Sequence, residues 1–151
     1  MNKKYRLSEL YPLIKEQLDS GGSASFVTNG VSMKPMLDDG KNTVCIVKPV
    51  FPLKKYDIPL YRRSDGAFVL HRIIKVKSDG YVCRGDHQTI KEYPVTDDMI
   101  IGVVTEYTKN GRAIRVKGLP HRLYAFIYVH TAYLRLYVRT FFIKLIRRIK
   151  R

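Results

Sequence analysis

Apolar residues recur every three or four positions over residues 7–19, a spacing that places them on one face of a helix. Ser8 is a candidate N-cap, and the run Ser20-Gly21-Gly22-Ser23 ends the segment. The pattern therefore predicts one short N-terminal helix, which forms a first unit of residues 1–23.

From residue 24 the pattern changes to short apolar and β-branched runs separated by turn signals. Ser64-Asp65-Gly66, Ser78-Asp79-Gly80 and Lys109-Asn110-Gly111 are typical of hairpin turns. Short strands at such close spacing favour a mainly β, antiparallel domain over βαβ units, and we place it at residues 24–118. The predicted strands are 24–28, 43–47, 58–62, 67–76, 81–84, 100–107 and 113–116.

Gly118-Leu119-Pro120 marks a second boundary, after which residues 121–149 show one apolar stripe at helical spacing. The stripe consists of Leu123, Ile127, His130, Leu134, Val138, Phe141, Leu145 and Ile149. This pattern predicts a single long amphipathic helix in a third unit, residues 119–151. A membrane-spanning helix is not expected, because no run of about 18 apolar residues is free of charge.

Charge separates this third unit from the rest of the chain. The 151 residues carry a formal net charge of +15, and 12 of the 28 Lys and Arg residues follow Glu106, after which no acidic residue occurs. A basic helix with an apolar stripe is typical of a helix that lies in a membrane interface. The anionic lipids of such a membrane would contact Arg135, Arg139, Lys144, Arg147 and Arg148. The same stripe also suits packing on the β domain, on a protein partner or on a second copy, and nucleic acid ranks behind these partners.

Several classes of protein are excluded by composition. Two cysteines, Cys45 and Cys83, are too few for a disulfide scaffold or a cysteine-rich zinc module. The four histidines have no cysteine or carboxylate at ligand spacing, so we expect neither a metal nor a cofactor. Residues 1–10 lack the apolar run of a signal peptide, so we expect a cytoplasmic protein, peripheral at the inner membrane face if the tail binds lipid.

Three polar residues together match the needs of nucleophilic catalysis. Ser32 lies between a glycine and a proline, where backbone freedom followed by rigidity can hold a hydroxyl at a fixed angle. His71 lies in an otherwise apolar strand, and a buried neutral histidine can accept a proton near neutral pH. Asp86 follows the next hairpin, where a carboxylate can orient the histidine. Singly, each also fits a plain structural role, as a turn serine, a core histidine or a turn aspartate.

Five short stretches in a fixed order extend this picture. They are Ser32-Met33-Lys34-Pro35-Met36-Leu37, Asp57-Ile58, Leu70-His71-Arg72-Ile73, Arg84-Gly85-Asp86 and Ile101-Gly102-Val103-Val104. In this order they resemble the boxes of the signal peptidase and LexA-type serine peptidase superfamily, over about residues 24–107. Histidine in the third box resembles the endoplasmic-reticulum and sporulation-type branch, whereas many bacterial signal peptidases have lysine there.

The resemblance implies a signal-peptidase-like β domain and a serine endopeptidase that cleaves signal, leader or precursor peptides. It implies a dyad of Ser32 as nucleophile and His71 as base, with Asp86 as a third, orienting residue. Family members bind an extended peptide as an added strand, so we expect a substrate groove. The residues expected to line this groove are Met33, Pro35 and Met36.

The chain departs from the family pattern at several points. Gly30 stands where many signal peptidases have a serine that assists the oxyanion hole, and His87 stands where the Gly-Asp box usually continues with asparagine. The N-terminal helix is too short and too charged to replace the family's membrane anchor. The alternative is a non-catalytic peptide-binding or regulatory protein on the same fold, with a basic tail that contacts membrane or nucleic acid. The sequence does not indicate an oligomeric state.

Overall fold

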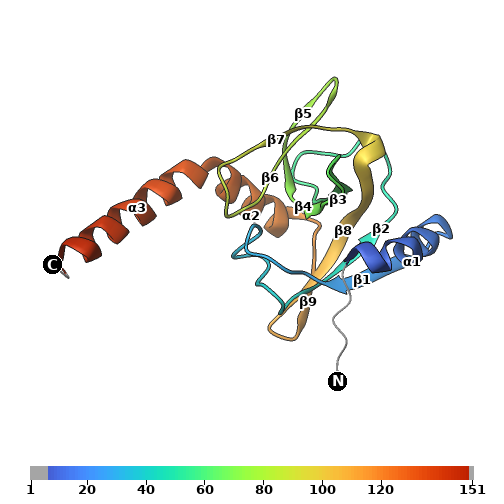
Figure 1. Cartoon of the computed structure of the whole chain (residues 1–151), viewed down its shortest axis with the longest axis horizontal. Coiled ribbons are helices and arrows are strands. Elements are labelled where there is room, and N and C mark those ends of the chain that lie inside the picture. The colour runs from blue at the N-terminus through green and yellow to red at the C-terminus, as the bar shows by residue number, and fades with distance from the viewer. Residues whose placement is uncertain (1–6, 150–151) are drawn as a thin grey trace.

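The computed structural model of this chain describes residues 7–149 and places antiparallel strands between helices at either end of the chain (Figure 1). The strands are β1 (Ser23–Val27), β2 (Thr43–Val47), β3 (Pro59–Arg62), β4 (Phe68–Leu70), β5 (Arg72–Lys77), β6 (Gly80–Arg84), β7 (Glu92–Val95), β8 (Ile100–Lys109) and β9 (Arg112–Arg115). The helices are α1 (Leu7–Asp19), α2 (Leu119–His130) and α3 (Ala132–Ile149), with a short 3-10 turn, η1, at Asp97–Met99.

The larger sheet has six strands in the order β1-β2-β8-β3-β4, and β9 also pairs with β8. All of its pairings are antiparallel, as the hairpin signals predict. The predicted N-terminal helix is confirmed as α1, whose buried Ile14 and Leu18 pack in one core with Val44, Ile46 and other apolar residues of this sheet. This burial of an apolar helix face is the main source of stability for so short a helix.

The smaller sheet has three strands in the order β5-β6-β7 and its own core, which includes Ile73, Cys83 and Val95. The strand predicted at 67–76 is in fact two strands in different sheets, since β4 ends at Leu70 and β5 begins at Arg72. His71 therefore lies where the chain crosses from one sheet to the other. The third strand, β7, was not predicted, because Pro94 within it lowers the strand signal.

The C-terminal segment is also divided. The single helix predicted for 121–149 is wrong, because α2 ends at His130 and α3 begins at Ala132. At the break, Thr131 has φ −95° and ψ 6°, and its hydroxyl donates a hydrogen bond of 2.6 Å to the carbonyl of Ile127. A β-branched residue that bonds back to the preceding turn bends a helix, whereas the apolar spacing continues through it unchanged.

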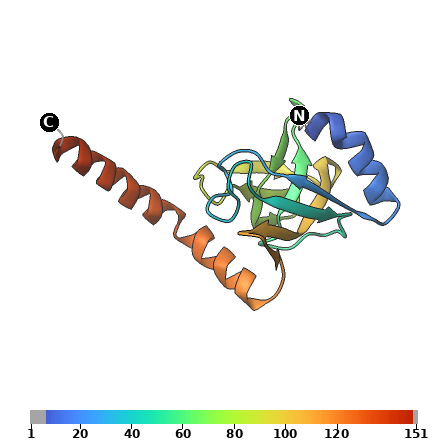
Figure 2. The same ribbon diagram turned by 90° about the horizontal axis from the view of Figure 1, so that it is seen from below.

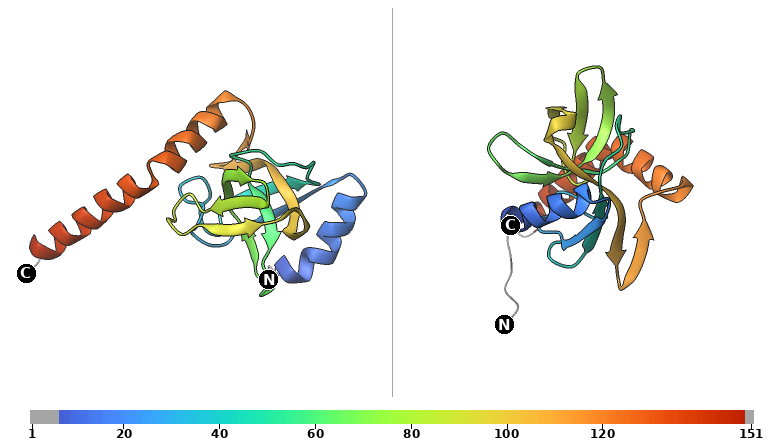
Figure 3. Two further views of the ribbon diagram at one scale, coloured as in Figure 1. Left: turned by 90° about the horizontal axis from the view of Figure 1, so that it is seen from above. Right: turned by 90° about the vertical axis from the view of Figure 1, so that its right-hand side faces the viewer.

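The predicted class is supported in part, because the sheets are antiparallel as expected, while the described residues form a mixed α and β structure. Figure 2 shows the strands gathered together with α1 along one side, while α3 extends well away from them. The right panel of Figure 3 shows the β5–β6 hairpin at one end of the strands and the β8–β9 hairpin at the other. None of the helices within residues 7–149 is long and apolar enough to cross a bilayer.

Candidate functional site

The loop between β1 and β2 holds Ser32 in a half-buried position. Gly30 has φ +101°, a conformation that glycine adopts readily and that other residues rarely adopt. Buried Met33 and Leu37 anchor the loop in the larger core, and the N–H of Leu37 donates to the carbonyl of Met33. Within residues 7–149, neither the hydroxyl nor the backbone N–H of Ser32 has a hydrogen-bond partner. Both groups are therefore free to act on a bound molecule.

His71 is buried at the crossing between the two sheets, with a side chain only 5% exposed. Its Nδ1 lies 3.0 Å from the Oε1 atom of Glu92 and 3.3 Å from the hydroxyl of Tyr61. Burial lowers the pKa of the imidazole below its usual value, and the Glu92 carboxylate opposes part of this effect. A neutral ring with its proton on Nδ1 fits these contacts, and it leaves Nε2 as the nitrogen that can accept a proton.

The carboxylate that contacts His71 belongs to Glu92, at the start of β7, and sequence reasoning missed it. Arg63 donates hydrogen bonds from Nε and Nη2 to the two carboxylate oxygens, at 2.7 Å for the first of them. Burial alone would raise the pKa of Glu92, but the hydrogen bonds from Arg63 and Tyr61 lower it below its usual value. The side chain thus stays ionised beside the imidazole near neutral pH.

Ser32 and His71 line the same pocket, which has a volume of about 220 Å³. Its other lining residues are Thr28, Asn29, Gly30, Met33, Leu37, Arg63, Phe68, Val69, Leu70 and Gln88. The structure thus brings together the nucleophile and base that the sequence predicts, and it adds Glu92 on the far nitrogen of the base. No direct hydrogen bond joins the two predicted residues among the contacts of the described chain. Such bonds are often long before substrate binds.

Asp86 is not placed where the sequence predicts it to act. Its two oxygens accept hydrogen bonds from Nε and Nη2 of Arg72, at 2.8 and 2.7 Å, and neither side chain is more than 2% exposed. The hydroxyl of Tyr124 also donates to Asp86 at 3.3 Å. Because a buried guanidinium needs a paired carboxylate, the predicted orienting acid of His71 is instead the counter-ion of the next residue, Arg72.

Gly85 lets the loop after β6 touch the loop that carries Ser32. A Cβ atom at Gly85 would lie 2.6 Å from the carbonyl oxygen of Ser32, too close for any other residue without a backbone shift. The same carbonyl accepts a hydrogen bond of 2.8 Å from the backbone N–H of His87. The Gly-Asp sequence therefore has two structural roles, since Gly85 permits this approach and Asp86 ties the loop to β5.

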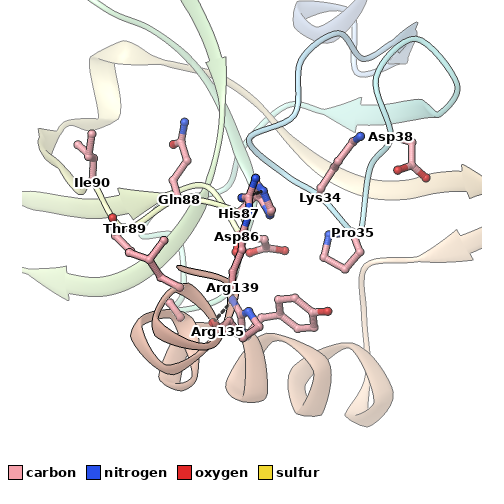
Figure 4. A pocket seen from close by; sticks show the side chains of 13 residues that line it. Lys34, Pro35, Asp38, Asp86, His87, Gln88, Thr89, Ile90, Arg135 and Arg139 are labelled. Carbon is pink, nitrogen blue, oxygen red and sulfur yellow. Dashed lines mark hydrogen bonds between the residues drawn. The ribbon is translucent and has the colours of Figure 1, made fainter. Parts of the chain in front are cut away.

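A larger hollow of about 570 Å³ lies beside the first and is walled by α2 and α3 (Figure 4). Gln88 lines both hollows. In Figure 4, Lys34, Pro35 and Asp38 come from that loop, and Arg135 and Arg139 come from the helix below. The full lining is Lys34, Pro35, Asp38, Asp86, His87, Gln88, Thr89, Ile90, Tyr128, Ala132, Arg135, Leu136 and Arg139.

The three predicted substrate-groove residues have different environments. Met33 lines the smaller pocket and Pro35 the larger hollow. Met36 lines neither of them, because it is 3% exposed in the core, where its sulfur accepts a hydrogen bond of 3.1 Å from Arg72. We therefore correct Met36 from a groove residue to a core residue.

Two of the predicted membrane-binding residues instead face the β domain. Arg135 donates from Nη2 to the carbonyl oxygens of Asp86 and Tyr128, at 3.1 and 2.9 Å. The Nη1 atom of Arg139 lies 2.9 Å from Nε2 of His87. Arg148 is exposed, and the side chains of Lys144 and Arg147 lie outside the described part of the structure.

Other chemistry finds little support in the described residues. No group of three or more His, Cys, Asp and Glu side chains within residues 7–149 is arranged to hold a metal ion. Burial raises the pKa of the Cys83 thiol to about 12, so this cysteine is protonated and a poor nucleophile. No protein-family model and no curated protein sequence matches the chain.

Proposed function

We propose that this protein is a serine endopeptidase in which Ser32 is the nucleophile, His71 the general base and Glu92 the residue that orients the base. One observation carries the proposal: Ser32 and His71 line one pocket, while Glu92 binds the nitrogen of His71 that a base of this kind does not use. The resemblance in the sequence supports the first two roles, and the contact geometry supports the third.

The proposed reaction follows from the free atoms of the site. The Oγ of Ser32 attacks the peptide carbonyl carbon as its proton passes to Nε2 of His71, and the free N–H of Ser32 is placed to bind the oxyanion. His71 then delivers the proton to the leaving amine, and the C–N bond breaks to leave an acyl-serine. Water gives a proton to His71 and attacks the ester carbon. His71 then returns that proton to the Oγ of Ser32 as the C–O bond breaks, which releases the acid. The Glu92 carboxylate stabilises the imidazolium throughout.

The two adjoining hollows suit an extended peptide better than a compact substrate. The smaller pocket holds the proposed reacting groups, and Gln88 is the lining residue that it shares with the larger hollow. A peptide that crosses Ser32 and passes Gln88 would contact both. Signal, leader or precursor peptides are the substrates that the resemblance favours.

A serine-reactive phosphonate tests the nucleophile directly. We expect the parent protein to be labelled, Ser32→Ala and His71→Ala to lose the label, and Ser78→Ala, which removes an exposed turn serine, to keep it. Mass spectrometry of the labelled peptide, together with digestion of a random dodecapeptide library, measures both reactivity and cleavage. Labelling that survives Ser32→Ala would overturn the assignment.

The hydroxyl of Ser32 makes no direct hydrogen bond to His71 within residues 7–149, and this observation favours a second candidate function. This function is a protein of the same fold that grips a peptide without cutting it. Library peptides that bind both the parent and Ser32→Ala, with no cleavage by either, would favour this second function over the first.

The proposed base sets a pH dependence for cleavage. Activity requires neutral His71, and burial lowers the pKa of this group below its usual 6.5. We therefore expect kcat/KM to rise with pH in a one-proton step whose midpoint lies below 6.5. The Glu92 carboxylate holds this pKa up, so Glu92→Gln is expected to move the midpoint lower still. A midpoint above 6.5 in the parent would contradict a buried, neutral base.

A further inference from the structure

One side of α2 and α3 is used to attach both helices to the β domain. The two alanines on this side, Ala125 and Ala132, are 0% and 5% exposed. Polar contacts from the same side reach the β domain through the hydroxyl of Tyr124, which donates to Asp86, and through Arg135. Ala132 follows Ala125 by seven residues and Arg135 follows Tyr124 by eleven, about two and three helical turns, so these positions form one attachment face across the break at Thr131.

The predicted apolar stripe lies away from this attachment face, and its side chains are open to solvent. Most of the exposed large hydrophobic residues of the described chain belong to α2 and α3. The predicted stripe is among them, with Leu123 57%, Ile127 47%, Leu134 62%, Val138 43% and Phe141 55% exposed. An apolar surface of this extent marks a site of interaction with a protein or a membrane.

The charge of this region disfavours a second copy of the chain as the partner and suits an anionic lipid surface. Residues 107–151 contain 12 Lys and Arg residues and no acidic residue, so two copies packed through these helices would bring like charges together. An anionic lipid surface would instead accept the apolar stripe and attract the basic residues beside it. The shape also fits, since α3 extends away from the strands and leaves room for a flat surface along its length (Figure 2).

We propose that the exposed apolar stripe of α2 and α3 binds the surface of an anionic membrane, with the helices lying in the interface. Neither helix is long and apolar enough to span a bilayer. The attachment face keeps the β domain on the water side, because Arg135 and Arg139 are bound to that domain and not to lipid. Exposed Arg148 supplies charge that meets the headgroups. This proposal does not depend on the peptidase function.

The test uses the full chain and sedimentation with vesicles at low salt. We expect the protein to pellet with vesicles of phosphatidylglycerol and phosphatidylcholine and to be released by salt. Leu134→Gln and Phe141→Gln should each weaken binding about tenfold or more, because each removes an apolar side chain from the lipid boundary. Arg148→Gln should weaken it roughly fivefold, as expected for the loss of one basic residue near an anionic surface.

Leu13→Gln is the matched control, because Leu13 is a helical leucine of α1 with 64% exposure, against 62% for Leu134. It should leave vesicle binding unchanged. Three results would overturn the proposal. The first is failure to pellet with anionic vesicles at low salt. The second is a lipid-free dimer in analytical ultracentrifugation that Leu134→Gln dissociates, which assigns the stripe to a second copy. The third is binding that Leu134→Gln and Phe141→Gln leave intact and that DNA competes away.

Discussion

Glu92→Gln is expected to lower the rate of Ser32-dependent cleavage by as much as about 10,000-fold, the loss seen when the acid of a serine triad is made neutral. The amide cannot stabilise the imidazolium, and its NH2 group can turn toward Nδ1 and favour the tautomer whose proton lies on Nε2. Such a ring cannot take the proton of Ser32. The rate is measured on a peptide selected from the library, with the fraction of folded protein determined by circular dichroism.

Glu16→Gln is the control for this prediction, since it makes the same chemical change at an exposed carboxylate on α1. It should cleave at the parent rate. A Glu92→Gln protein that folds and cleaves within a few-fold of the parent would remove Glu92 from the mechanism and leave a dyad of Ser32 and His71.

Asp86→Ala is expected to lower the stability of the fold and to leave the chemical step of the proposed reaction unchanged. Loss of the carboxylate leaves the guanidinium of Arg72 buried, 0% exposed, without a counter-ion. Breaking a buried ion pair from one side typically costs about 3–5 kcal/mol, a large part of the stability of a domain of this size. Urea unfolding followed by circular dichroism should therefore show a much lower midpoint for the variant than for the parent.

Two further variants separate this role from catalysis. Asp98→Ala removes an exposed aspartate and should change stability by no more than about 0.5 kcal/mol. Asp86→Asn keeps an oxygen that can accept a bond from Arg72, so a folded fraction should survive and still cleave. A stable Asp86→Asn protein without activity would restore Asp86 as the orienting acid that the sequence pattern suggests.

The sequence singled out Ser32 and His71, which the structure places at one pocket, because each lies in a distinctive local context, a Gly–Pro loop and an apolar strand. It did not find Glu92, for two physical reasons. Pro94 hides β7 as a strand, and the approach of Glu92 to His71 depends on the pairing of Cys83 with Glu92 across the β6–β7 register. A register that includes a bulge is set by tertiary packing and cannot be obtained from the spacing of residues alone.

The sequence did contain a signal for the true partner of Asp86, which is Arg72, but the predicted partner was His71. Arg72 lies in the same apolar run as His71, and a charge in such a run needs a carboxylate. If Arg72 had been predicted to pair with Asp86, a different carboxylate would have been expected beside His71. The apolar stripe of residues 121–149 gave no sign of the break at Thr131 or of which helix face meets the β domain, because both depend on contacts with the rest of the fold.

The crossing of the chain between sheets at His71 has a consequence for when activity can arise. The loop with Ser32 belongs to the six-stranded sheet, whereas Glu92 and the strand that follows His71 belong to the three-stranded one. On the proposed function, a folding intermediate with only one sheet formed has either a nucleophile or an oriented base, but never both. The newly made chain would stay inert until its two cores have docked.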